Sequence, residues 1–162
     1  MTFARSLSVE DDYLYVISYI NIRLLPLHFS LCNNIFNHRD ILLISFFNDN
    51  SLFYLINIYS DSSQTALKYL KNTGFSINNV FIMTGDFNIY DSLWDSMYPF
   101  HSSHSDILFN VADAFDLDLS VPTNHIPTRY TDDKHNSNLV IDLMFLRHGT
   151  EEFDNHHIYL DW

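Results

Sequence analysis

The chain has 162 residues, of which 47% are hydrophobic, and a formal net charge of −12 at pH 7. This composition excludes a disordered chain, and the length suits one domain with its own core. A single cysteine excludes an internal disulfide. Every apolar run is shorter than the roughly 20 residues that a membrane helix needs. We therefore expect one mixed α and β domain over residues 1–162, intracellular (nuclear or cytoplasmic), without a signal peptide.

Three strands are predicted in the first third of the chain. Residues 1–12 are polar and end in an acidic run, so we expect a disordered lead-in. Residues 13–22 are rich in aromatic and β-branched side chains, which favours a strand. Residues 40–47 and 51–59 predict a β-hairpin, because Asn48-Asp49-Asn50 separates two apolar runs.

A helix and a buried strand are expected next. Ser62 or Ser63 can cap the helix, Gly74 can end it, and its apolar stripe comprises Ala66, Leu67 and Leu70. Residues 80–83 are apolar at every position, which is typical of a strand that is buried on both faces.

Polar residues follow directly after this strand. Gly85 interrupts the apolar run, and Asp86 and Asn88 come next. At the end of a strand, a carboxylate and a carboxamide can be held rigidly over a substrate. Gly, Asp and Asn are also the commonest turn residues, so an ordinary turn explains the same sequence, and spacing alone favours the turn.

The next segment leads into a second helix. His101, His104 and Asp106 suggest a metal site, but no closing ligand pair accompanies them. We favour a helix that is capped by Ser103 and has Asp106 near its positive end. Its expected apolar face comprises Ile107, Leu108, Val111, Ala112 and Phe115.

A single carboxylate stands inside the last predicted strand. Residues 122–130 read as an extended segment because of their prolines, and residues 139–146 as a strand that contains Asp142. Burying this carboxylate without a partner would cost several kcal/mol. Two interpretations stay open: a structural ion pair with Arg129 or Arg147, and a place in a site that is open to water or to a cation.

Four separated motifs follow one another in the chain: Asn57-Ile58-Tyr59, Gly85-Asp86-Phe87-Asn88, Pro127-Thr128-Arg129-Tyr130 and Ile141-Asp142. In this order they resemble the endonuclease/exonuclease/phosphatase superfamily, and the sequence around them is most similar to its retrotransposon-type, apurinic-like endonuclease branch. The resemblance implies an α+β fold, with a two-sheet sandwich of mostly antiparallel strands flanked by helices in four layers (α/β/β/α). It also implies Mg²⁺-dependent hydrolysis of phosphodiester bonds in DNA.

The resemblance also implies a role for each matched residue. Asp86 would orient and deprotonate the attacking water, and Asn88 would hold the phosphate or the water. Tyr59 would donate to a phosphate oxygen, and Thr128 would position the phosphate or the loop that carries Asp86. Asp142 would support the site electrostatically. Taken singly, Tyr59 is equally explained as an ordinary strand aromatic and Thr128 as an ordinary residue of an extended segment.

The sequence departs from the superfamily pattern at three points. The sequence has no counterpart of the metal-binding Glu, of the Ser before Ile-Asp, or of the Ser-Asp-His motif that carries the phosphate-contacting His. We therefore expect a domain truncated at both ends. Activity is then doubtful, and the alternative is an inactive remnant that binds a partner or self-associates through exposed sheet edges. A phosphatase of the same superfamily ranks lower. The eight Lys and Arg residues form no run, which gives DNA binding weak support.

Overall fold

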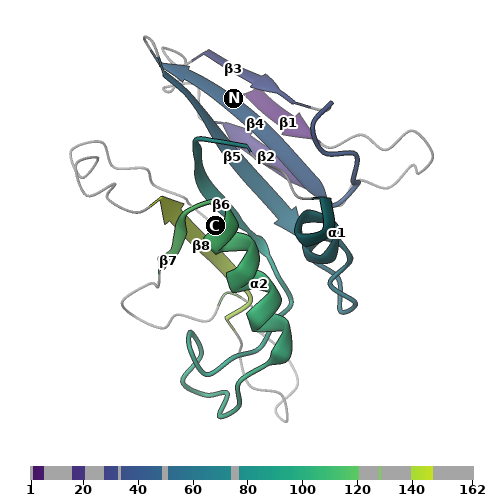
Figure 1. Ribbon diagram of the computed structural model, residues 1–162, viewed down its shortest axis with the longest axis vertical. Helices are drawn as coiled ribbons and strands as arrows, with labels where there is room; N and C mark the ends of the chain where they lie inside the picture. The colour runs from purple at the N-terminus through teal and green to yellow at the C-terminus, as the bar shows by residue number, and fades with distance from the viewer. Residues whose placement is uncertain are drawn as a thin grey trace.

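The computed structural model describes residues 2–5, 16–20, 28–32, 34–48, 51–73, 77–120, 128 and 140–147. These residues form strands and two helices (Figure 1). The strands are β1 (Thr2–Arg5), β2 (Ile17–Ile20), β3 (His28–Leu31), β4 (Ile41–Asn48), β5 (Ser51–Tyr59), β6 (Val80–Asp86), β7 (Leu117–Ser120) and β8 (Asp142–Arg147). The helices are α1 (Thr65–Thr73) and α2 (Ser103–Ala114).

One mixed sheet organises the molecule. Its six strands lie in the order β3-β4-β5-β6-β8-β7, and every neighbouring pair is antiparallel except β5 and β6. The parallel pair needs a crossover connection, which α1 supplies between the two strands. Strands β1 and β2 form a separate antiparallel pair.

The two faces of the sheet bury different sets of side chains. Apolar residues of both helices, such as Leu67 and Leu108, belong to one core cluster with Ile58, Met83 and Phe145 of the sheet. The opposite face carries a smaller cluster of Val16, Leu42 and Ile44. Because Val16 directly precedes β2, and the Asn57 amide donates to Ser18 Oγ at 2.8 Å, the β1–β2 pair lies against this second face. The predicted α+β sandwich is thus confirmed as helices, a mixed sheet and a second small sheet.

The elements with strong local patterns form where they were expected. Strands β4 and β5 make the predicted hairpin, and β6 is buried along nearly its whole length. The stripe of α1 is buried at Ala66, Leu67 and Leu70, as predicted. Neither helix of the described residues is long and apolar enough to cross a membrane.

Both predicted helix caps were wrong in detail. The Asp61 carboxylate accepts from the Thr65 backbone amide at 3.0 Å, so Asp61 rather than Ser62 or Ser63 satisfies the start of α1. The N-cap of α2 is Ser102, one residue before the predicted Ser103, and its side chain accepts from the His104 amide. Gly74 lies outside the described residues.

Three strands escaped the sequence patterns. Residues 2–5, predicted to be disordered, form β1 by pairing with β2, and neither β3 nor β7 was predicted. Each of these strands has four residues, too few for a period-2 pattern to stand out, and forms because a partner strand satisfies its backbone. Of the predicted strand 13–22, Ile17–Ile20 form β2, and residues 13–15 and 21–22 lie outside the described residues. Residues 122–127 and 129–130 lie outside them as well.

Candidate active site

Three of the predicted site residues occupy adjoining positions on three neighbouring strands. Tyr59 of β5 pairs with Asp86 of β6 in parallel register, and Asp86 pairs with Asp142 of β8 in antiparallel register. Because residues that oppose one another across a ladder share a face of the sheet, the three side chains leave the same face. Tyr59 packs against the cluster of Leu42 and Ile44, so this is the face opposite the helices.

The glycine before Asp86 is required by the packing of β5 against β6. Gly85 has φ 148°, and a Cβ atom at this position would lie 1.8 Å from the Ile58 carbonyl oxygen. No side chain fits there without moving the two strands apart. Gly85 therefore permits the close pairing that puts Asp86 beside Tyr59.

Asp86 and Asn88 form a turn that is tied to the end of β5. The Asn88 amide donates to Asp86 Oδ1 at 3.0 Å, and Asn88 adopts φ 48°. The Asn88 side-chain amide donates to the Ser60 carbonyl at 3.0 Å, and the Ser60 amide donates to the Asp86 carbonyl at 2.8 Å. The turn interpretation is thus correct, and the same turn fixes the carboxylate and the carboxamide beside Tyr59.

Thr128 joins the site through the beginning of β8. Its hydroxyl oxygen accepts from the backbone amides of Ile141 and Asp142, both at 3.0 Å. Burial raises the pKa of Asp142, and a hydrogen bond from Thr128 acts in the opposite direction. Arg147 lies at the other end of β8, near Asp116 and Asn79, and does not form the ion pair that was considered for Asp142. Arg129 lies outside the described residues.

A buried glutamine that sequence reasoning missed links the two site loops. Gln64 is fully buried, accepts from Ser60 Oγ at 2.7 Å and donates to the Phe87 carbonyl at 3.2 Å. It also adopts φ 57°, which is uncommon for a residue with a side chain. Gln64 therefore couples the residue after Tyr59 to the residue after Asp86.

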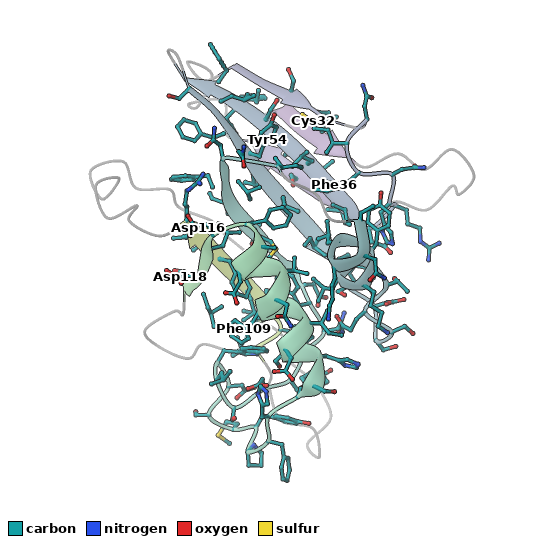
Figure 2. All side chains as sticks on the ribbon, viewed as in Figure 1. Cys32, Phe36, Tyr54, Phe109, Asp116 and Asp118 are labelled. Atoms are coloured by element: carbon teal, nitrogen blue, oxygen red, sulfur yellow. The ribbon has the colours of Figure 1, made fainter. Side chains whose placement is uncertain are left out.

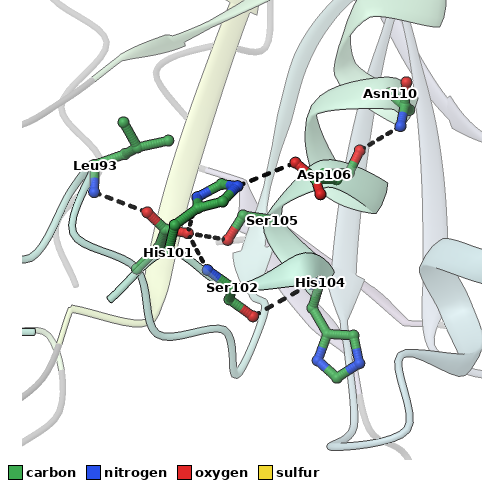
Figure 3. Close-up of polar contacts among 8 residues, drawn as sticks. Leu93, His101, Ser102, His104, Ser105, Asp106 and Asn110 are labelled. Carbon is green, nitrogen blue, oxygen red and sulfur yellow. Dashed lines mark hydrogen bonds and ion pairs between the residues drawn. The ribbon is translucent and has the colours of Figure 1, made fainter. Parts of the chain in front are cut away.

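Buried Asp91 was missed as well, and it organises the start of α2 (Figure 3). Its carboxylate accepts from the Leu93 amide at 2.9 Å, the Ser102 amide at 2.8 Å and Ser105 Oγ at 2.5 Å. Burial disfavours the ionised form, but these hydrogen bonds outweigh it and hold the pKa of Asp91 below its usual range. A lone acidic residue in a loop gave no sequence signal for this role.

The contacts of His101 account for the residues that had suggested a metal. His101 Nδ1 lies 2.7 Å from Asp91 Oδ2, and its Nε2 lies 3.1 Å from Asp106 Oδ1. His101 thus bridges two carboxylates, while the His104 ring points away from His101 and Asp106 (Figure 3). Within the described part of the chain, no three His, Cys, Asp or Glu side chains are grouped so as to hold a metal ion.

The donor chemistry of the strand ends does suit magnesium. The carboxylates of Asp86 and Asp142 and the amide oxygen of Asn88 are hard oxygen ligands. Mg²⁺ commonly uses one or two protein carboxylates and completes its shell with water and substrate phosphate. Burial disfavours the ionised form of Asp142, and a bound cation would offset that cost.

The fold and the polar strand ends define an endonuclease-like domain. The chain belongs to the endonuclease-reverse transcriptase family, whose sequence model matches residues 41–161. This range contains all five predicted site residues. Among solved structures, the chain resembles the endonuclease domain of TRAS1, a telomere-specific non-LTR retrotransposon, with a TM-score of 0.68 and 14% identity. The match covers 91% of this chain and 67% of that domain. No curated protein matches the sequence.

Proposed function

We propose that the chain is a Mg²⁺-dependent phosphodiester hydrolase that nicks DNA. The observation that carries this proposal is the register of Asp86, which lies opposite Tyr59 on one side and opposite Asp142 on the other. Two carboxylates and a phenol thereby line one end of the sheet, which supports roles for them as general base, metal ligand and hydrogen-bond donor to phosphate. Membership of an endonuclease family supports the choice of DNA as the substrate.

Each residue has a chemical role in this proposal. Asp86 would accept the proton of the attacking water, and its hydrogen bond from the Asn88 amide would fix the carboxylate for that transfer. The Tyr59 hydroxyl would donate to a non-bridging phosphate oxygen, where negative charge grows in the transition state. Thr128 would keep the beginning of β8, and therefore Asp142, at a fixed distance from Asp86.

The metal would enter beside these residues. A cation would stabilise the ionised form of Asp142, because burial disfavours its charge. Bound Mg²⁺ would supply neutralisation of the phosphate and stabilisation of the leaving oxygen.

Nicking of supercoiled plasmid tests the proposal. We expect the unaltered chain to convert the plasmid to the open circle in the presence of Mg²⁺. The rate for Asp86→Asn should be lower by about 100-fold or more, which is the loss expected when a general base is removed. Asp113→Asn is the matched control, because Asp113 is an exposed aspartate of α2. Equal background from the unaltered chain and Asp86→Asn would refute a catalytic role.

A second candidate is a domain of the same fold that binds a partner without catalysis. The net charge of −12 favours it, because an acidic surface repels the DNA backbone. Absence of nicking together with concentration-dependent association in sedimentation would support this function over hydrolysis.

A further inference from the structure

The loop between β6 and α2 exposes large apolar side chains to an unusual degree. Leu93, Met97 and Phe100 are 55%, 73% and 68% exposed. For comparison, Phe47 near the end of β4 is 45% exposed. Leaving such side chains in water forgoes the stabilisation that burial gives. A cluster of them is typical of a binding surface.

The loop is held firmly, so this exposure is built in. The Ser92 amide donates to the Phe100 carbonyl at 3.0 Å, which closes the base of the loop. Asp95 accepts from the Met97 amide at 2.9 Å and from the Val140 amide at 3.3 Å. Trp94 anchors the same stretch, since it is only 1% exposed. Side chains on such a frame are presented in a fixed arrangement.

Aromatic rings in the loop form a row that starts near the candidate active site. Tyr90 and Tyr98 have ring centroids 5.8 Å apart, and Tyr98 and Phe100 have centroids 6.0 Å apart. Tyr90 follows Asn88 by two residues, so the row begins within about 8 Å of Asn88 along the backbone. In Figure 1 the loop lies at the end of the molecule from which β8 starts, which is the end that carries Asp142. The exposed side chains around it are drawn in Figure 2.

The charge of this segment restricts what it can bind. Residues 87–106 contain Asp91, Asp95 and Asp106 but no Lys or Arg. The loop therefore offers phosphates no lysine or arginine, and His101 beside it is already held by Asp91 and Asp106, whereas stacking of bases on aromatic rings needs no charge. Placement beside a phosphodiester site favours bases as the occupant.

We propose that this loop, residues 90–100, binds unpaired nucleobases next to the bond that is cut, by stacking them on Phe100 and Tyr98 with Met97 alongside. The proposal rests on the proposed function, because the site at Asp86 is what places nucleic acid near the loop. It names the substrate class as DNA with a single-stranded or melted stretch, since paired bases do not offer their faces.

Binding to oligonucleotides with and without bases tests the proposal. The full chain is titrated in EDTA against a fluorescent single-stranded oligonucleotide and against one of equal length with abasic positions. We expect Phe100→Ala to weaken binding of the base-containing strand about tenfold. Phe47→Ala, an exposed phenylalanine far from the loop, is expected to change nothing. The abasic strand is expected to bind weakly and equally to the unaltered chain and to Phe100→Ala.

Several outcomes would overturn the inference. Equal affinity of the unaltered chain for both strands would show that bases are not recognised. An equal loss for Phe47→Ala would show a general apolar effect. If Phe100→Ala abolishes self-association without changing the affinity for oligonucleotides, the occupant of the loop is a second copy of the chain. If Phe100→Ala instead abolishes binding of a basic protein, the occupant is a protein partner.

The titration and the nicking assay together separate this inference from the proposed function. If Asp86→Asn abolishes nicking while Phe100→Ala leaves the affinity unchanged, the loop inference fails and the hydrolase stands. If Phe100→Ala weakens binding of base-containing DNA although no nicking occurs, the loop binds bases and the hydrolase fails.

Discussion

Asp86 on β6 lies directly opposite Asp142 on β8. Burial raises the pKa of Asp142, so the fold disfavours the ionised form of this carboxylate. The fold therefore retains, opposite Asp86, a carboxylate whose ionised form disfavours stability. Such a local penalty is understandable where the carboxylates have a chemical task.

Asp142→Asn is expected to raise stability and to lower nicking. At neutral pH the free energy of unfolding should rise, because the variant no longer buries an ionised carboxylate. A raised folded-state pKa means that the ionised Asp142 weakens the fold as pH rises above the usual aspartate value of 3.8. The difference should therefore vanish in acid. Urea unfolding at both pH values measures it, and a less stable variant at neutral pH would contradict the expectation.

Thr128 offers a test of positioning with a conservative rescue. Thr128→Val removes the oxygen that accepts from the Ile141 and Asp142 amides, so we expect about 1–3 kcal/mol less stability and slower nicking. Thr128→Ser retains the hydroxyl and should recover most of both. Parallel urea unfolding and nicking assays compare the two variants. Equal behaviour of Val and Ser would show that the hydroxyl does not position Asp142.

Gly85 is predicted to tolerate no side chain. In Gly85→Ala the new Cβ would meet the Ile58 carbonyl oxygen, so β6 must move away from β5. We expect about 3 kcal/mol or more of lost stability, at the upper end for overpacked positions. Thermal unfolding measures it, with Ser92→Ala as an exposed control that should change little. An alanine variant of unchanged stability would show that the strands can separate freely.

Local signals explain how much of this architecture the sequence could predict. The stripe Ala66, Leu67 and Leu70 and the hairpin of β4 and β5 depend on neighbouring residues, so the pattern was sufficient. Strands β1, β3 and β7 depend on distant partners, and four residues carry too little pattern to predict them. Short strands of this kind need tertiary pairing before they can be recognised.

The residues of the candidate site also differ in whether a local sequence pattern reveals them. Asp86 and Asn88 stood out in one short motif, whereas Tyr59 was singled out only through the resemblance to the superfamily, because the parallel register that sets it beside Asp86 has no local sequence signal. Gln64 looked like a polar residue ahead of a helix, and only the packing of two loops reveals its bridging role. Asp91 was likewise invisible, since its donors come from up to 14 residues away in the chain.

The bridge between His101 and two carboxylates predicts a pH dependence. A hydrogen bond with Asp106, opposed by desolvation and helped by Asp91, raises the pKa of His101 above 6.5. The stabilisation from this raised pKa is therefore fully present below 6.5 and is lost as pH rises through the folded-state pKa. We expect the thermal midpoint to fall over that interval, and His101→Gln to flatten the fall.

His104→Gln is the matched control for this prediction. His104 lies in the first turn of α2, three residues after His101, and its ring points away from His101 and Asp106 (Figure 3). The variant should therefore keep the pH dependence of the unaltered chain, as measured by thermal unfolding in buffers of equal ionic strength. Because Phe100 immediately precedes His101, loosening this bridge at alkaline pH should also weaken the hold on the loop. If His101→Gln and the unaltered chain show the same pH profile, the bridge does not contribute to stability.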